Sequence, residues 1–216
     1  SDGNTVAIGA NASGGGGYYA GHVRVFNWNG TSWNQLGQDI DGEAAGDESG
    51  RSVSLSSDGN TVAIGAHGNN GSYGDAGHVR VYNYNGSSWN QIGQDIDGEA
   101  YSDLSGIHIS LSGDGNIVAI GAIHNNGNGT HAGHVRIYNW GGSSWTQIGF
   151  DIDGEAAGDE SGTSVSLSSN GNTVAIGAQY NGNWTSSGHV RVYSIGGIGY
   201  TSPPCSGCTD SLAVNY

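Results

Sequence analysis

The chain has 216 residues, of which 42 are glycine, and its five basic residues, all arginine, face 19 acidic ones for a formal net charge of −14. Such a balance offers no positive surface for a nucleic-acid backbone or for an anionic membrane, so the sequence argues against both partners and against direct membrane insertion. Abundant glycine with only 11% charged residues can mark disorder, but six tryptophans and eleven tyrosines argue for a fold.

The sequence is an internal repeat. The segment SDGNTVAIGA at 1–10 returns at 57–66, and close copies start at 113 and 169, so successive starts lie 56 residues apart. A second block, GHVRV or GHVRI, follows in each copy. We therefore divide the chain into a repeat region, 1–195, and a Gly/Pro/Cys tail, 196–216. The units within the repeat region are about 1–56, 57–112, 113–168 and 169–195.

Each full repeat predicts four β-strands, which in the second copy lie at 52–56, 61–66, 78–84 and 89–96. The first pair flanks Asp58-Gly59, and Asp-Gly supplies the positive φ that tight hairpin turns need. Tyr84 and Trp89 stand at the two mouths of the second turn, where a cross-strand aromatic pair would hold the register. No stretch has the period of an amphipathic helix, so the chain is predicted to be all-β.

Repeated four-stranded antiparallel units predict a β-propeller-like array of blades in which neighbouring blades supply most of the core. The repeats provide three, four, four and three strands, or about three and a half to four blades. Three arrangements stay open: a four-bladed ring, a fragment of a longer propeller, and association of chains through incomplete blades.

Polar residues recur on one face of the third strand. Val79 and Val81 alternate with His78 and Arg80, and both faces of a middle blade meet neighbours, so the polar side chains need partners. Four of the five arginines take this place, and an acidic segment recurs beside them. We predict a repeated structural clamp, an ion pair or hydrogen bond in each blade, made by Arg24, Arg80, Arg136 and Arg191 with those local acids.

The order GxSVSLSxDGNTVAIGA, a variable loop and then GHVRVYxW resembles the FG-GAP-type repeats of integrin α-subunit propellers and of bacterial surface proteins, over about 1–195. The resemblance implies a propeller fold in an extracellular protein, secreted or attached to the cell surface. The family's Phe-Gly is Ser49-Gly50 here, and its acidic calcium loop is the short turn 56–60. The integrin-type calcium site is therefore not carried over.

A cation could bind elsewhere, because hard oxygen donors at alternating positions suit calcium. The candidate ligands are Asp39, Asp41, Glu43 and Asp47, and the alternative is a solvated acidic linker or acids paired with the strand arginines. The eight histidines show no zinc-binding spacing. No other cofactor is expected.

No motif of a catalytic nucleophile, a metalloprotease or a phosphate-binding loop is present, which predicts a protein that is not an enzyme. Paired carboxylates leave a glycosidase-like enzyme as a remote alternative. Those acids recur in three repeats, which is not how a single active site is normally marked.

Specific recognition is expected where the repeats differ, in the loops 11–20, 67–76, 123–132 and 179–187, which would share one rim of the propeller. Candidate contacts for a glycan or protein ligand are Tyr18, Tyr19, Tyr73, His124, His131, Tyr180 and Trp184. The N-x-S/T sequons on these loops and on the second turns make candidate glycosylation sites of Asn11, Asn29, Asn70, Asn85, Asn128 and Asn183.

The tail contains Cys205 and Cys208. A CxxC pair can serve redox chemistry or zinc, but no second ligand pair accompanies it. CSGCTDSLAVNY resembles the start of a small GCTD-type repeat of secreted bacterial proteins, and this implies a disulfide role for both cysteines in an oxidising setting.

Together these features predict a non-enzymatic extracellular protein for adhesion or ligand recognition through the variable rim. The main alternative is a structural subunit of an extracellular fibre or coat, in which copies of the chain pair through blade edges.

Overall fold

The computed structural model describes residues 3–14, 16–71, 73–180 and 187–195. Every regular element in this part of the chain is a β-strand, so the all-β prediction is confirmed. The described residues include no helix suited to crossing a membrane.

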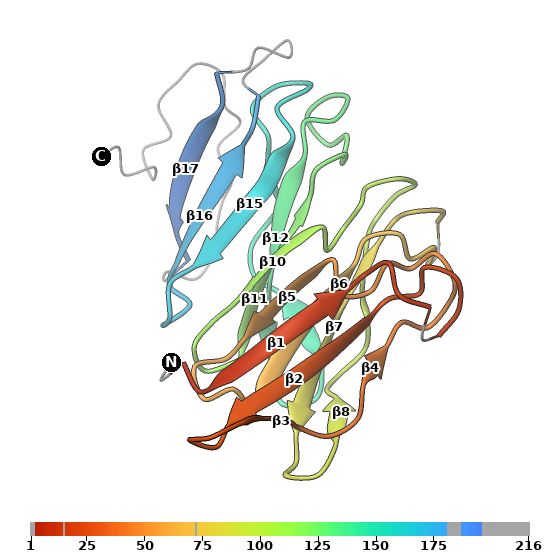
Figure 1. Cartoon of the computed structure of the whole chain (residues 1–216). Coiled ribbons are helices and arrows are strands. Elements are labelled where there is room, and N and C mark those ends of the chain that lie inside the picture. Colours follow the sequence, from red (N-terminus) through yellow and green to blue (C-terminus); the bar gives the residue numbers. More distant parts are fainter. Residues whose placement is uncertain (1–2, 15, 72, 181–186, 196–216) are drawn as a thin grey trace.

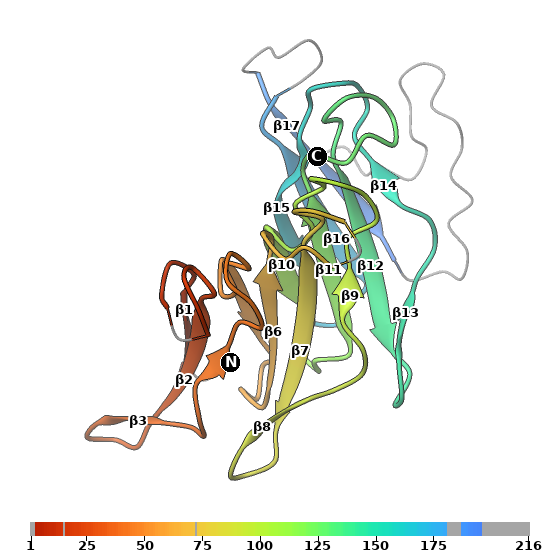
Figure 2. The same ribbon diagram turned by 90° about the vertical axis from the view of Figure 1, so that its right-hand side faces the viewer.

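The strands form four antiparallel sheets, which we call blades and which lie side by side (Figures 1 and 2). The blades are offset from the repeat units, because the last strand of one unit pairs in the sheet of the next. Blade 1 contains β1 (Thr5–Ala10), β2 (His22–Trp28), β3 (Trp33–Gln35) and β4 (Ile40–Asp41). Blade 2 contains β5 (Ser52–Leu55), β6 (Thr61–Ala66), β7 (His78–Tyr84), β8 (Trp89–Gln91) and β9 (Ile96–Asp97). Blade 3 contains β10 (His108–Leu111), β11 (Ile117–Ala122), β12 (His134–Trp140), β13 (Trp145–Gln147) and β14 (Ile152–Asp153). Blade 4 contains β15 (Ser161–Leu167), β16 (Thr173–Ala178) and β17 (His189–Ser194).

The first hairpin of blades 2, 3 and 4 forms because the turn satisfies its own polar groups. In blade 2 the Ser56 hydroxyl donates to Asp58 Oδ1 at 2.6 Å, and the same oxygen accepts the Asn60 amide at 3.0 Å. Gly59 has a φ of 72°, the left-handed conformation that only glycine adopts readily. The Asp-Gly turn therefore ends β5 and starts β6 where the sequence predicts it.

The second hairpin holds its predicted aromatic pair but breaks the strand that follows. Tyr84 and Trp89 face each other across the ladder with ring centroids 5.1 Å apart. The strand expected over 89–96 is instead two short strands, β8 and β9, which both pair with β7. The cause is Gly93, whose φ of 76° turns the chain out of the ladder between them. Each middle blade thus has five strands, where the sequence predicted four.

The hydrophobic cores lie between blades. One core joins blades 1 and 2 and consists of Val23, Val25, Ile40, Val62, Ile64, Tyr82 and Trp89, and two further cores join blades 2 and 3 and blades 3 and 4 in the same way. Trp89 also donates its indole N–H to the Leu36 carbonyl of blade 1 at 2.8 Å. Blade 1 covers Trp89, which is 4% exposed, whereas the equivalent Trp33 of blade 1 is 48% exposed. Each blade therefore depends on a neighbour for its burial.

The first strands of successive blades pack together, with β10 in contact with both β5 and β15. Serines join them: Ser54 Oγ accepts the Leu111 amide and Ser110 Oγ accepts the Leu167 amide, each at 2.9 Å. At the loop end of these strands the Ser52 hydroxyl donates to the Gly106 carbonyl at 2.7 Å. This arrangement brings the starts of β5 and β10 together beside the variable loops.

Candidate functional site

The loops between the second and third strands of a blade pack against the connections between blades, and together they form what we call the rim. The Gly46 amide donates to the Tyr18 carbonyl at 2.9 Å, and Glu48 N–H donates to the Tyr19 carbonyl at 3.0 Å. The next loop continues the contact, because the Gly68 amide donates to the Asp47 carbonyl at 3.2 Å. Backbone hydrogen bonds thus fix the rim to the blades.

The rim carries the predicted ligand contacts in separate groups. Tyr18 and Tyr19 are exposed and their rings meet edge to face at 4.3 Å, and Tyr73 is exposed on the next loop. His124 and His131 stack at 4.3 Å on the third loop. Tyr180 lies on the fourth loop and is half-buried. Trp184 lies outside the described residues.

The described sequon asparagines use their side chains within the fold. In the second turns the side-chain oxygens accept amides of their own turn, and in the loops the side chains reach the loop or the neighbouring connection. The residues concerned are Asn11, Asn29, Asn70, Asn85 and Asn128. Asn183, Cys205 and Cys208 lie outside the described residues.

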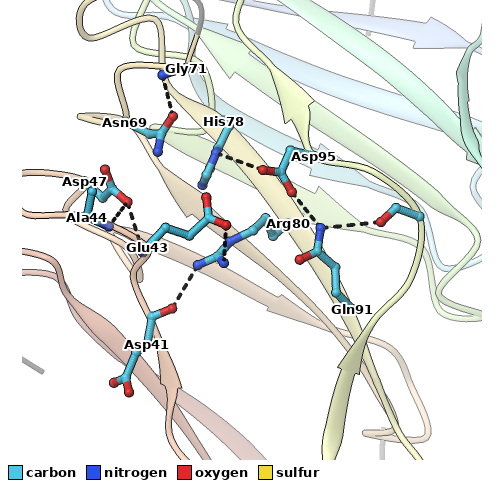
Figure 3. A network of polar contacts seen from close by, with 11 residues as sticks. Asp41, Glu43, Ala44, Asp47, Asn69, Gly71, His78, Arg80, Gln91 and Asp95 are labelled. Carbon is cyan, nitrogen blue, oxygen red and sulfur yellow. Dashed lines mark hydrogen bonds and ion pairs between the residues drawn. The ribbon is translucent and has the colours of Figure 1, made fainter. Parts of the chain in front are cut away.

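The recurring arginines reach across to the preceding blade (Figure 3). Arg80 Nη2 donates to the Asp41 carbonyl at 2.9 Å and Nη1 lies 3.3 Å from Glu43 Oε1. Arg136 repeats both contacts with the Asp97 carbonyl and the Glu99 carboxylate, at 2.7 and 3.3 Å. Arg191 bonds the carbonyl of Asp153 at 2.6 Å, with its Nη1 3.9 Å from Glu155. Each of these contacts joins two blades.

Arg24 differs because no blade precedes it among the described residues. It pairs with Asp39 of its own repeat at 2.8 Å and has a side chain that is 46% exposed, against 7% for Arg80. The Arg24 guanidinium is the main cause that lowers the pKa of Asp39. The arginine of blade 1 thus pairs within its own blade, whereas the other three reach the preceding one.

The acids considered as calcium ligands have different partners. Asp39 binds Arg24, the Asp41 carboxylate is exposed, and Glu43 faces the next blade. The Asp47 carboxylate accepts the amides of Glu43 and Ala44 at 3.1 and 2.9 Å, which closes the turn (Figure 3). A calcium site made by all four remains a prediction.

Each histidine at the start of the third strand lies against carboxylates. His78 Nδ1 is 3.7 Å from Asp95 Oδ2 (Figure 3), and His134 Nδ1 is 3.6 Å from Asp151 Oδ2. Both side chains are 1% exposed. Burial lowers the pKa of His78 and lowers that of His134 to about 4, so both imidazoles are neutral at pH 7.

A second group of titratable residues forms where the repeats differ, and we call it the rim cluster: Glu48, Arg51, His67 and His108. Arg51 directly precedes β5, and His67 directly follows β6, the strand paired with β5. His108 starts β10, which the Ser52 hydrogen bond holds against the start of β5. The third repeat has Ile107 in place of Arg51, so the cluster is not repeated.

The two histidines of the rim cluster are held neutral. Burial lowers the pKa of His67 and of His108, and the nearby positive charge of Arg51 lowers both further. Glu48 opposes this effect at His67, whose Nε2 lies 3.9 Å from Glu48 Oε2, while Asn11 Nδ2 donates to the same oxygen at 2.9 Å. His67 Nδ1 is buried without a hydrogen-bond partner. The cluster therefore combines a permanent cation with two unprotonated bases.

Sequence reasoning missed this cluster, because His67 and His108 stand 41 positions apart and match no spacing motif. A comparison of the repeat copies with one another could have found it. Aligning the copies shows that Arg51, His67 and His108 each replace a residue that other copies keep uncharged and not histidine. Departures from the repeat, read together with strand pairing, bring the three to one place.

No protein-family model matches the chain, and a search of curated proteins also gave no match. Solved structures do match. A Bacteroides uniformis protein described as a 6-phosphogluconolactonase aligns with a TM-score of 0.55 at 14% identity, over 82% of this chain and 45% of that one. The periplasmic gluconolactonase PpgL of Pseudomonas aeruginosa aligns with a TM-score of 0.53 at 16% identity, over 88% of this chain and 49% of its own.

These similarities show the fold alone, a propeller-like array, and the chain spans less than half the length of either protein. They also correct the functional prediction. We expected a non-enzymatic adhesion protein because catalytic sequence motifs are missing, but two structures that share the fold are lactonases by name. The absence of motifs therefore does not exclude an enzyme, because a function depends on a site and this fold can carry a catalytic one.

Proposed function

We propose that the rim cluster binds a small anionic carbonyl compound and that the protein hydrolyses a sugar-acid lactone there. The observation that carries the proposal is the gathering of Arg51, His67 and His108 at one end of β5 and β10, at positions where the repeats differ. In a chain with a net charge of −14, such a group is the natural place for a carboxylate or phosphate. The lactonase names of two proteins with this fold supply the reaction class.

The residues can divide the reaction between them. A neutral histidine, His67 or His108, takes a proton from water as the water oxygen attacks the lactone carbonyl carbon. Arg51 stabilises the negative charge that develops on the carbonyl oxygen, or holds the anionic group of the substrate. The bond from the carbonyl carbon to the ring oxygen then breaks, and the histidinium returns its proton to the ring oxygen. Glu48, whose Oε2 lies 3.9 Å from His67 Nε2, would help to orient His67.

The experiment measures acid release from glucono-1,5-lactone, with and without a 6-phosphate, against spontaneous hydrolysis. The chain should accelerate the reaction, and Arg51→Gln should lower the rate on the order of 100-fold, the loss typical of one oxyanion donor. His67→Gln and His108→Gln test the base, and at least one should cost about 100-fold or more.

Arg24→Gln is the matched control, because it removes the same charge from an exposed ion pair outside the rim cluster. It should leave the rate unchanged. Hydrolysis no faster than the spontaneous rate, or equal losses in Arg51→Gln and Arg24→Gln, would refute the proposed function.

We also propose that the propeller is of the FG-GAP type and that the protein works outside the cytoplasm. The repeat order that resembles FG-GAP units supports the first part, and the composition of the tail, with its CxxC pair, supports the second. Secretion assays with the full natural protein would test the location, and retention in the cytoplasm would contradict it.

A further inference from the structure

A group of three ligand-type side chains lies between blades 2 and 3, apart from the rim cluster. His134 starts β12, Asp151 precedes β14 in the same blade, and Glu99 follows β9 of the preceding blade. One ligand atom from each lies within 4.8 Å of the others. Glu43, His78 and Asp95 form the same group between blades 1 and 2.

The histidine of this group is buried without a partner. His134 is 1% exposed, and neither of its ring nitrogens has a hydrogen bond. Buried polar groups in proteins almost always have partners, so a buried imidazole with both nitrogens unpaired indicates a ligand that satisfies it.

The distances fit a shared ion better than a hydrogen bond. His134 Nδ1 and Asp151 Oδ2 are 3.6 Å apart, too far for a hydrogen bond. Two ligands of one zinc ion, each about 2.0–2.1 Å from the metal in tetrahedral geometry, lie about 3.4 Å apart. Gln147 Nε2 donates to the other Asp151 oxygen at 2.7 Å and so holds Oδ2 toward the histidine.

The charges also favour a cation. Glu99, Asp151 and Asp103 are acids, and Arg136, whose Nη1 lies 3.3 Å from Glu99 Oε1, is the cation paired with them. A divalent ion would balance the excess negative charge of the three acids.

We propose that the protein binds a zinc-like divalent cation between neighbouring blades, at His134, Glu99 and Asp151 and again at His78, Glu43 and Asp95. One imidazole with two carboxylates is a donor set that suits zinc, and hard ions such as calcium prefer oxygen alone. The ion would join two blades, because the glutamate comes from one blade and the other two ligands from the next.

The test titrates the whole chain with Zn²⁺ in competition with a chromophoric chelator. Glu99→Gln and Glu43→Gln should each remove one bound equivalent, and the double variant should remove two. Zn²⁺ should raise the melting midpoint of the wild type, because it binds the folded state, and should raise that of the double variant much less. Glu43 and Glu99 are about half exposed, so both variants should fold, and circular dichroism checks this.

Asp75→Asn is the matched control, since Asp75 is exposed on the rim and belongs to none of these groups. It should bind as many equivalents as the wild type. A double variant that binds as much Zn²⁺ as the wild type, or wild-type protein that binds none, would overturn the proposal. So would displacement of the Zn²⁺ by an equal concentration of Ca²⁺.

Discussion

Replacing Trp89 by alanine should show directly that the blades are stabilised by their neighbours. Trp89 is 4% exposed in the core between blades 1 and 2 and donates its indole N–H to the Leu36 carbonyl at 2.8 Å. Truncation of a buried tryptophan costs about 3–5 kcal/mol, and the lost hydrogen bond about 1 kcal/mol more. We therefore expect Trp89→Ala to lower the free energy of unfolding by about 4–6 kcal/mol.

The chain contains its own control for this prediction. Trp33 occupies the same repeat position and the same hairpin but is 48% exposed, so Trp33→Ala should cost only about 1–2 kcal/mol. Trp145, which is 4% exposed and bonds the Ile92 carbonyl, should behave like Trp89.

Urea unfolding followed by circular dichroism gives the three values under one set of conditions. Similar losses for Trp33→Ala and Trp89→Ala would refute the argument. The side chain would then act within its own hairpin, and burial by the neighbouring blade would contribute little.

Three further predictions concern single sites. Arg136→Gln should cost about 2–3 kcal/mol in urea unfolding because it leaves Glu99 and the Asp97 carbonyl without their buried arginine partner, whereas exposed Arg24→Gln should cost under about 1 kcal/mol. Gly65→Ala should lower the free energy of unfolding more than Gly86→Ala does. A Cβ at Gly65 would lie 2.0 Å from the Gly106 carbonyl oxygen. A Cβ at Gly86 would meet no atom, so Gly86→Ala should cost only the strain of a positive φ, about 1–2 kcal/mol. The unfolded chain protonates His134 below about pH 6.5, whereas the folded chain does so only near pH 4. The free energy of unfolding should therefore fall by up to about 3 kcal/mol as the pH is lowered from 6.5 to about 4. In thermal melts, His134→Gln should lose less stability over this range.

The fold could be predicted from the sequence because each copy of the repeat contains the same turn residues and the same strand pattern. Asp58-Gly59 determines the first turn, and the pairing of Tyr84 with Trp89 determines the register of the second. The interruption at Gly93 was missed, because a glycine in a strand does not reveal its φ from the sequence.

The partners of the polar residues were harder to predict. The sequence placed Arg80 beside recurring acids but could not say that it reaches back to Glu43 of the preceding blade. That choice depends on how two sheets pack, which no local pattern encodes. The histidines at the start of the third strands show no metal-binding spacing in the sequence for a similar reason, because their carboxylate neighbours come from two blades.

Cores that lie between blades have a consequence for how such a chain can vary in length. Every junction is built from the same pair of complementary faces, so adding or deleting one whole unit of 56 residues recreates a junction that already exists. Near-identical copies such as 1–10 and 57–66 also favour recombination in register at the level of the coding sequence. A change of a few residues inside a strand would misplace its clamp and its core together, whereas a variable loop can absorb one, as the shorter loop 179–187 does while Arg191 keeps its contact. Related chains should therefore differ in length by whole units. Each added or deleted unit would include its own variable residues.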